Sequence, residues 1–215
     1  MSLPAHDTGV VELFAALAYA ELTAFSRLAS DSDVAPTLTA RIELAALAAR
    51  ELQHHQLLAD RLRDLGADPR TAMAPFTAAV DHFHARTRPR TWAERLVKTA
   101  VIDGLAEDLL GQLAPRLADT EQGLLERVLD RSDSDRVVAS LLTEALAAEP
   151  MAAGRLSLWG RRVLGEAMSH GQLSGVDHPH LAVTVVGTDD VAALSAFLGR
   201  LAAGHAERLA AAVRP

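Results

Sequence analysis

The sequence contains no cysteine, so disulfide bonds, thiolate zinc sites and a cysteine nucleophile are excluded. Any bound metal must therefore be held by Asp, Glu and His side chains. Aromatic residues are also scarce, at 4% of the chain, whereas alanine and leucine are abundant. Small side chains let helices approach one another closely, because the distance between helix axes depends on the side chains at the contact.

Positive charge is in short supply as well. The formal net charge of -7 argues against a broad nucleic-acid-binding face. Residues 1–7 lack the basic start of a signal peptide, and no apolar run has the form expected of a membrane span. Glycine-rich phosphate loops and nucleophile elbows are missing too, which disfavours nucleotide-dependent and hydrolase chemistry. We expect a cytoplasmic protein with no membrane partner.

The spacing of the apolar residues predicts helices almost throughout, separated by Pro, Gly and Asp. We expect four bundle helices at about 8–29, 37–65, 91–117 and 132–148, a helical crossover at 70–85, a short helix at 119–129, and two C-terminal helices at 151–169 and 189–213. Between the last two, we expect a loop in which a short stretch resembles a strand without a pairing partner. The prediction is an all-α protein, a single domain over residues 1–215, with a bundle core at about 8–148 and C-terminal helices at about 151–213.

One carboxylate stands alone in the first predicted helix. Within residues 13–26, Glu21 is the only ionisable group apart from the phenol of Tyr19. An unpaired buried carboxylate costs several kcal/mol, so a cation, a proton or a metal should compensate it. Asp103 repeats this pattern in the third bundle helix.

A second signal lies on the next helix, where Glu51 and His54 are three residues apart. This spacing places a carboxylate and an imidazole one turn apart on the same helix face. The apolar stripe of this helix includes both residues, so both should point into the bundle. Together with the lone carboxylates, the pair predicts a metal site inside the bundle.

The order of these elements resembles the ferritin-like superfamily and, more narrowly, its MiaE-like branch in actinobacteria, which is named after a tRNA hydroxylase. The segments that carry the resemblance are Tyr-Ala-Glu-Leu at 19–22, Glu-Leu-Gln-His at 51–54, Met-Ala-Pro-Phe at 73–76, Asp-Gly-Leu at 103–105, and 154–162 with 165–167. The resemblance implies a four-helix bundle with a long crossover and two additional C-terminal helices. It also implies two irons that activate dioxygen, with Glu21, Glu51, His54 and Asp103 as metal ligands.

The fourth bundle helix departs from that pattern. Residues 131–138 read Arg-Ser-Asp-Ser-Asp-Arg-Val-Val, and no histidine occurs between His84 and His170. With Arg136 where a ligand is expected, we predict at most one tightly held metal per chain. Asp135 could supply one oxygen, and Glu166 with His170 could replace the missing pair if the fifth long helix faced the site.

A second interpretation needs no metal. The lone carboxylates Glu21 and Asp103 could instead be neutralised across the bundle by a basic side chain, for which the candidates are Arg50, Lys98 and Arg136. Two functions therefore stay open: an iron-dependent oxygenase or oxidase, and a non-catalytic ferritin-like scaffold that has lost its metal. The acidic balance predicts no tight tRNA binding, while a homodimer and an unidentified small-molecule substrate are left open.

Overall fold

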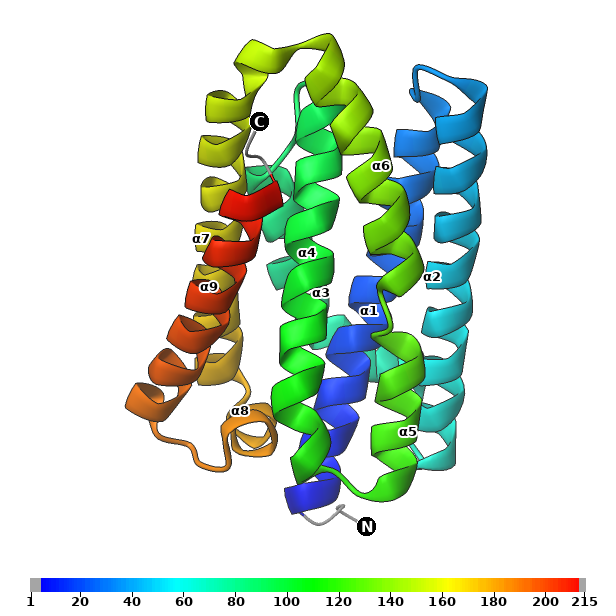
Figure 1. Cartoon of the computed structure of the whole chain (residues 1–215). Coiled ribbons are helices and arrows are strands. Elements are labelled where there is room, and N and C mark those ends of the chain that lie inside the picture. Colours follow the sequence, from blue (N-terminus) through cyan, green and yellow to red (C-terminus); the bar gives the residue numbers. More distant parts are fainter. Residues whose placement is uncertain (1–4, 213–215) are drawn as a thin grey trace.

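The computed structural model describes the backbone of residues 5–212 and the side chains of residues 8–204. Within that range the chain forms helices and no strand, which confirms the all-α prediction (Figure 1). The bundle helices are α1 (Ala5–Asp33), α2 (Leu38–Asp64), α4 (Trp92–Leu113) and α6 (Ser132–Ala148). The other helices are the crossover α3 (Pro69–Arg86), the short α5 (Asp119–Val128), and α7 (Ala153–Asp177), α8 (Pro179–Val186) and α9 (Val191–Ala212).

Side-chain caps explain where several helices begin. The hydroxyl of Thr37 accepts a hydrogen bond from the backbone N–H of Ala40 at 3.1 Å and so starts α2. Asp68 starts α3 in the same way, and Thr91 starts α4. Gly66 follows α2 with φ +77°, a left-handed conformation that suits glycine and ends the helix. These local signals fixed the predicted boundaries closely.

The helices form two hairpins that face each other, with further helices on one side. One hairpin is α1 with α2, and the other is α4 with α5 and α6 (Figure 1). The crossover α3 returns the chain to the upper end of the bundle, so that α2 and α4 run in the same direction. On the far side of α1 and α4 lie α3, α7, α8 and α9, which makes these two helices the middle of the molecule.

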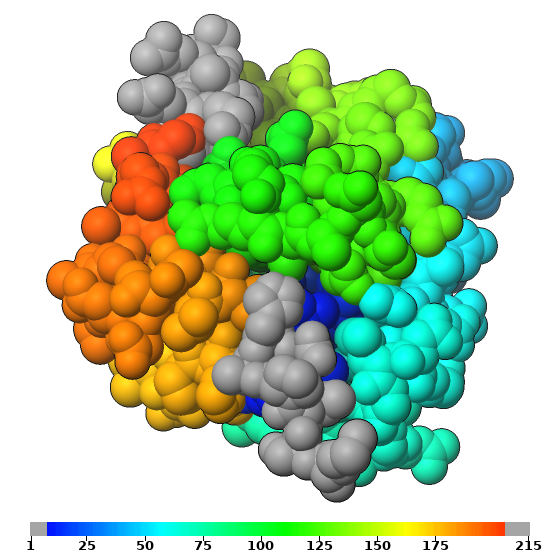
Figure 2. Space-filling view, turned by 90° about the horizontal axis from the view of Figure 1, so that it is seen from below, coloured from blue at the N-terminus to red at the C-terminus, as the bar shows by residue number. Residues whose placement is uncertain are grey.

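Helix α1 is covered by protein on both sides. It packs against α2, α3 and α8, and the side chains of Phe14, Ala15 and Ala18 are fully buried. Figure 2 shows blue residues of α1 lying between the green and cyan segments at the lower end of the molecule. By length and composition the part at 8–33 is apolar enough to cross a membrane, contrary to our reading of the sequence. Two bent helix pairs pass the same test only if each is counted as one span. The buried position of α1 within the bundle accounts for its apolar character.

The segment at 171–187 is helical, so the predicted loop with a strand-like stretch is wrong. Helix α7 continues to Asp177, and α8 follows directly. A carboxylate oxygen of Glu12 on α1 accepts a hydrogen bond from the backbone N–H of Leu181 at 2.7 Å, which satisfies a free amide in the first turn of α8. A Cβ at Gly9 would lie 2.1 Å from Oγ1 of Thr184, so glycine permits the close approach of α1 and α8. Contacts with α1 override the β-propensity of the valines.

The buried apolar residues separate into two clusters along the bundle. The upper cluster includes Leu28, Leu44 and Val101, and the lower one includes Leu58 and Leu113, among others. Helices α1, α2 and α4 contribute to both clusters, whereas α6 contributes to the upper cluster and α5 to the lower one. The polar side chains discussed next lie between the two clusters.

Candidate metal centre and ion cluster

The candidate site occupies the middle of the bundle, between the two apolar clusters. Along α1, Glu21 falls between Ala18 of the lower cluster and Leu28 of the upper cluster. On α2, Glu51 and His54 fall in the same way between the clusters. All three side chains are buried, at 3%, 3% and 6% exposure respectively. Apolar packing above and below therefore closes the site off from water.

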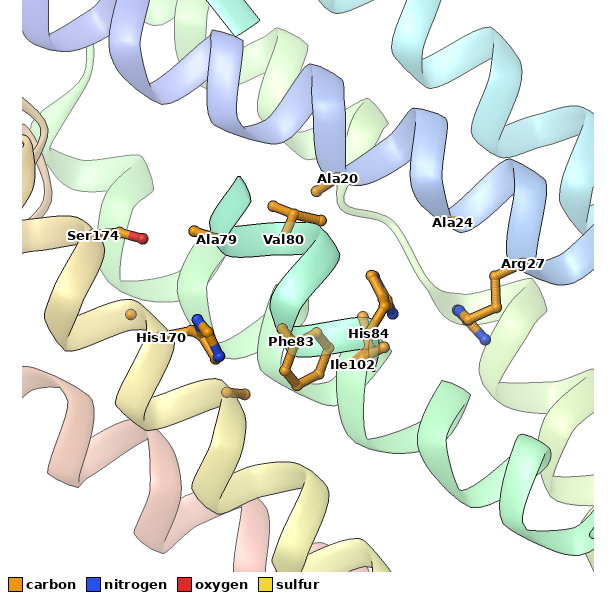
Figure 3. Close-up of a pocket in the computed structure, with 12 residues that line it drawn as sticks. Ala20, Ala24, Arg27, Ala79, Val80, Phe83, His84, Ile102, His170 and Ser174 are labelled. Atoms are coloured by element: carbon orange, nitrogen blue, oxygen red, sulfur yellow. The ribbon is translucent and has the colours of Figure 1, made fainter. Parts of the chain in front are cut away.

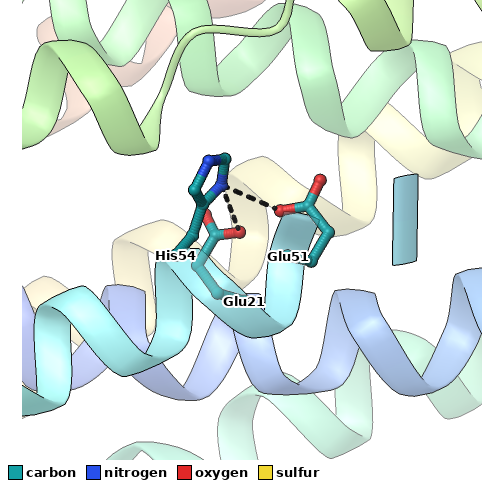
Figure 4. A group of neighbouring side chains, drawn as sticks. All are labelled: Glu21, Glu51 and His54. Carbon is teal, nitrogen blue, oxygen red and sulfur yellow. Dashed lines mark ion pairs between the residues drawn. The ribbon is translucent and has the colours of Figure 1, made fainter. Parts of the chain in front are cut away.

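Glu21, Glu51 and His54 form a compact group, as predicted (Figure 4). One potential ligand atom from each lies within 4.8 Å of the others, which is close enough to hold a metal ion. The Nδ1 atom of His54 lies 3.4 Å from a carboxylate oxygen of Glu51 and 3.7 Å from one of Glu21. It makes no hydrogen bond, and neither does Oε2 of Glu21. The two unpaired atoms thus face each other in a buried space.

Arg131 provides the positive charge that the carboxylates require. Its Nη1 donates to both carboxylate oxygens of Glu51, at 2.9 and 2.8 Å, and its Nη2 donates to Glu21 at 2.6 Å. The guanidinium therefore bridges α1 and α2 from the opposite hairpin. Its side chain is only 6% exposed, and a desolvated arginine with two carboxylate partners is held strongly.

Asp103 belongs to the same cluster but has a different direct partner. The hydroxyl of Ser134 donates to a carboxylate oxygen of Asp103 at 2.5 Å. Asp103 also interacts electrostatically with Arg131, which it helps to keep charged. It lies outside the group of three possible ligands formed by Glu21, Glu51 and His54. Its role as a metal ligand stays a prediction.

Burial and mutual interactions shift the pKa values in the cluster. Burial raises the pKa of Glu21 to about 7, and the neighbouring Glu51 adds to the shift. Although burial alone would raise it, Glu21, His54 and the charge of Arg131 lower the pKa of Glu51. Burial also raises the pKa of Asp103 to about 6. Glu21 is therefore partly protonated near neutral pH.

The cation that balances the cluster is not one of the three that we considered from the sequence. Arg136 is 69% exposed and pairs with Asp133 at 3.2 Å, and Arg50 pairs with Asp133 as well. The Nζ atom of Lys98 donates to the backbone carbonyl of Thr87 at 3.0 Å. A basic side chain does pair with Glu21, as the second interpretation of the sequence predicted, but it is Arg131 and none of the three candidates.

The other residues considered as substitute ligands lie elsewhere. Glu166 pairs with Arg86 at 3.0 Å, and the ring of His170 makes an edge contact with His82 of α3. Both contacts place α7 against α3, on the far side of α1 and α4 from the cluster. Asp135 is exposed on α6. None of these three residues joins the candidate site.

Each of the two hairpins directs one pair of side chains with i, i+3 spacing into the site. On α2 the inward pair Glu51 and His54 has i, i+3 spacing. At the start of α6, Arg131 and Ser134 have the same spacing and also point inward. Ferritin-like two-metal proteins carry Glu-x-x-His at both places. Here arginine and serine stand where the second carboxylate and histidine belong, so the residues present do not fit a two-metal centre.

The position of Arg131 follows from a break in the fourth bundle helix. Helix α5 ends at Val128, α6 starts at Ser132, and Arg131 lies in the turn between them with φ -106° and ψ 6°. A carboxylate oxygen of Asp130 accepts the backbone N–H of Ser132 at 3.0 Å and stabilises this turn. The repeated i, i+3 spacing of Arg131 and Ser134, next to buried Leu129 and Val137, is the sequence signal that would have identified them.

Comparison with known protein families gives one result. The model described as the ferritin-like domain of actinomycetes matches residues 4–188, which is most of the chain. A search of curated proteins finds no match.

Proposed function

The chain belongs to the ferritin-like domain family of actinomycetes, and we propose that it is a member in which an internal ion cluster has replaced the two-metal centre, leaving a non-catalytic helical scaffold. In this proposal the conserved shape of the bundle is kept while the redox chemistry is lost. The tRNA hydroxylation and iron dependence that the resemblance implies are not part of it. Fold membership alone does not decide function, which depends on the site.

The observation that carries the proposal is the position of Arg131. Its guanidinium donates to both Glu21 and Glu51, the carboxylates that a metal would need. A divalent ion bound there would have to displace this group or lie beside its charge, and like charges in a buried site repel strongly. The arginine thus supplies the neutralisation that a metal supplies in other bundles.

A second candidate function is supported by a separate observation. Glu21, Glu51 and His54 still have ligand atoms within 4.8 Å of one another, and Oε2 of Glu21 and Nδ1 of His54 have no hydrogen-bond partner. These groups could hold one metal ion if Arg131 moved away. Two carboxylates and one imidazole suit iron, and a bound iron with open positions supplies oxygenase or oxidase chemistry.

Metal analysis distinguishes the two candidates. The full chain is produced in iron-supplemented medium, purified without chelators, and measured for metal content, and a second sample is titrated anaerobically with Fe(II) while its thermal unfolding is followed. A metal that binds only the folded protein raises the unfolding temperature. We expect far less than one metal per chain and no shift in unfolding temperature.

His54→Ala is the matched variant for this experiment. If the native chain binds about one metal per chain and His54→Ala loses it, the single-metal candidate is correct and the scaffold proposal is wrong. His55→Ala is the control for the substitution itself, because Nδ1 of His55 donates to the backbone carbonyl of Ala18 at 2.8 Å instead.

A further inference from the structure

A cavity of about 230 Å³ lies on the opposite side of α1 from the ion cluster. It is enclosed by α1, α3, α4 and α7, and Ala20, Ala24, Val80 and Ile102 give it an apolar wall (Figure 3). Alanines on α1 leave the space that larger side chains would fill. We call this space the apolar cavity.

The apolar cavity continues toward the C-terminal helices. A second cavity of about 280 Å³, lined by leucines, alanines and valines of α1, α4, α7, α8 and α9, shares Ala167, Gly171 and Ser174 with the first. Together the two reach the size range of about 300–1,000 Å³ that is usual for small-molecule sites. The walls of both cavities are mainly apolar, which suits a hydrocarbon chain.

The other end of the apolar cavity is polar. Arg27 and His84 line it there, and Figure 3 shows the two side chains directed toward each other. Neither Nε of Arg27 nor Nδ1 of His84 has a hydrogen-bond partner, although both atoms are buried. Buried polar atoms are normally paired, so two orphans at the end of one cavity point to a ligand group that is missing.

A third cavity of about 450 Å³, which we call the cationic cavity, adjoins the apolar cavity and shares Arg27 and His84 with it. Its wall carries four cationic side chains, Arg27, Arg88, Arg95 and Lys98, and two carboxylates, Asp31 and Asp81. Asp31 is already shared between Arg27 and Arg95, and Asp81 accepts the phenol of Tyr19 at 2.8 Å. The excess of positive charge favours an anion.

We propose that these adjoining cavities bind one aliphatic carboxylic acid, with its hydrocarbon chain in the apolar cavity and its carboxylate between Arg27, His84 and Lys98. A carboxylate matches a guanidinium in geometry and charge, and it accepts hydrogen bonds from the two orphaned nitrogens. The apolar wall excludes a ligand that is polar along its length. The proposal is independent of whether the ion cluster binds a metal.

Titration of the full chain with decanoate tests this proposal. Isothermal titration calorimetry should give one decanoate per chain, whereas 1-decanol, which has the same chain without the charge, and acetate, which has the charge without the chain, should bind at least about tenfold more weakly. Because Lys98 is the only lysine, its Cε resonance in protein labelled with ¹³C-lysine should shift on addition of decanoate and not of acetate.

Variants assign the binding to these cavities. Arg27→Gln and Lys98→Met should each weaken decanoate binding about tenfold to a hundredfold and leave decanol binding unchanged. Ala24→Phe should abolish binding of both probes by filling the apolar cavity, whereas Ala45→Phe, the same change on the exposed face of α2, should not. Thermal unfolding of each variant verifies that it folds.

Three results would overturn the proposal. One is the absence of decanoate binding, another is decanol binding as tightly as decanoate, and the third is decanoate binding that survives in folded Ala24→Phe. If Ala24→Phe does not fold, Arg27→Gln and Lys98→Met still decide the matter, because only a carboxylate held by these cations loses affinity when they are removed.

Discussion

Helices α1 and α4 each carry buried charges on two faces, and the two faces differ in how the charge is balanced. Toward α2 and α6, Glu21 accepts a hydrogen bond from Arg131 and Asp103 accepts one from Ser134, so each carboxylate has a direct partner. Toward α3 and α7, Arg27 and Lys98 lie beside open cavities and outnumber their acidic partners. We call Glu21, Glu51, Asp103 and Arg131 the matched cluster, because its charges pair with one another and so stabilise the fold. We call Arg27, His84 and Lys98 the surplus cluster, because its excess positive charge and the adjoining free volume suit a ligand.

The largest effect should come from breaking the matched cluster. Arg131→Met removes the cation while leaving Glu21 and Glu51 buried, so we expect a loss of about 3–5 kcal/mol in the free energy of unfolding. Chemical denaturation measures it. Arg136→Met, on the exposed face of α6, should change stability by less than about 0.5 kcal/mol.

A triple variant separates lost charge balance from lost packing. If uncompensated charge causes the loss, Arg131→Met combined with Glu21→Gln and Glu51→Gln should recover most of the stability, because the neutral amides need no cation. A combined variant that is no more stable than Arg131→Met alone would show that the guanidinium acts through packing instead.

The surplus cluster makes a prediction about pH. Burial, together with the charge of Arg27, lowers the pKa of Lys98 to about 7 from 10.5. Between these values the folded chain has released a proton that the unfolded chain still holds, so the stability of the native protein should rise as pH increases through this window. The gain is on the order of 5 kcal/mol at most.

Lys98→Met is the variant that tests this pH dependence, and it should lack the rise. The Cε resonance of the one lysine should titrate directly with a midpoint near neutral pH. A titration of the lysine near its unperturbed pKa would show that the ammonium is hydrated and that the cationic cavity is open to solvent. An equal rise in the stability of Lys98→Met with pH would show that Lys98 does not cause the pH dependence.

The smallest effect concerns polyanions. Arg86, Arg88 and Arg90 form the densest basic cluster in the sequence, and Arg86 already pairs with Glu166. Tight binding needs several clustered cations that release counterions, so we predict no sub-micromolar affinity for tRNA at physiological salt. Fluorescence anisotropy measures it, and a tight complex with a steep salt dependence would contradict the prediction.

The comparison also explains which parts could be predicted from the sequence. Glu21 and Asp103 were identifiable because a lone carboxylate in an apolar helix demands a partner nearby, and Glu51 with His54 because one helix fixes their geometry. Their partner Arg131 had a weaker signal, its i, i+3 spacing with Ser134. Arg131 lies in a turn between two helices, where a helical pattern gives no direction for a side chain, so Arg136 was considered in its place.

The fold shows the same division between local and long-range information. Capped and strongly periodic helices such as α2 were predicted to within a residue or two. Helix α8 was missed because its start depends on Glu12, far away in the sequence, and its valines favour a strand locally. The surplus cluster was missed for a related reason, since Arg27, His84 and Lys98 come together only when α1, α3 and α4 pack.

The central claim is that Arg131 and Ser134 stand in place of a second metal-ligand pair. Its most direct test is the metal content of the double variant Arg131→Glu with Ser134→His, which restores a Glu-x-x-His spacing opposite Glu51 and His54. Native protein and double variant are reconstituted anaerobically with Fe(II) in parallel and measured for iron per chain, with Arg136→Glu as the charge-matched control. We predict iron uptake by the double variant and none by the native protein or the control. Two irons per chain in the native protein would contradict the account.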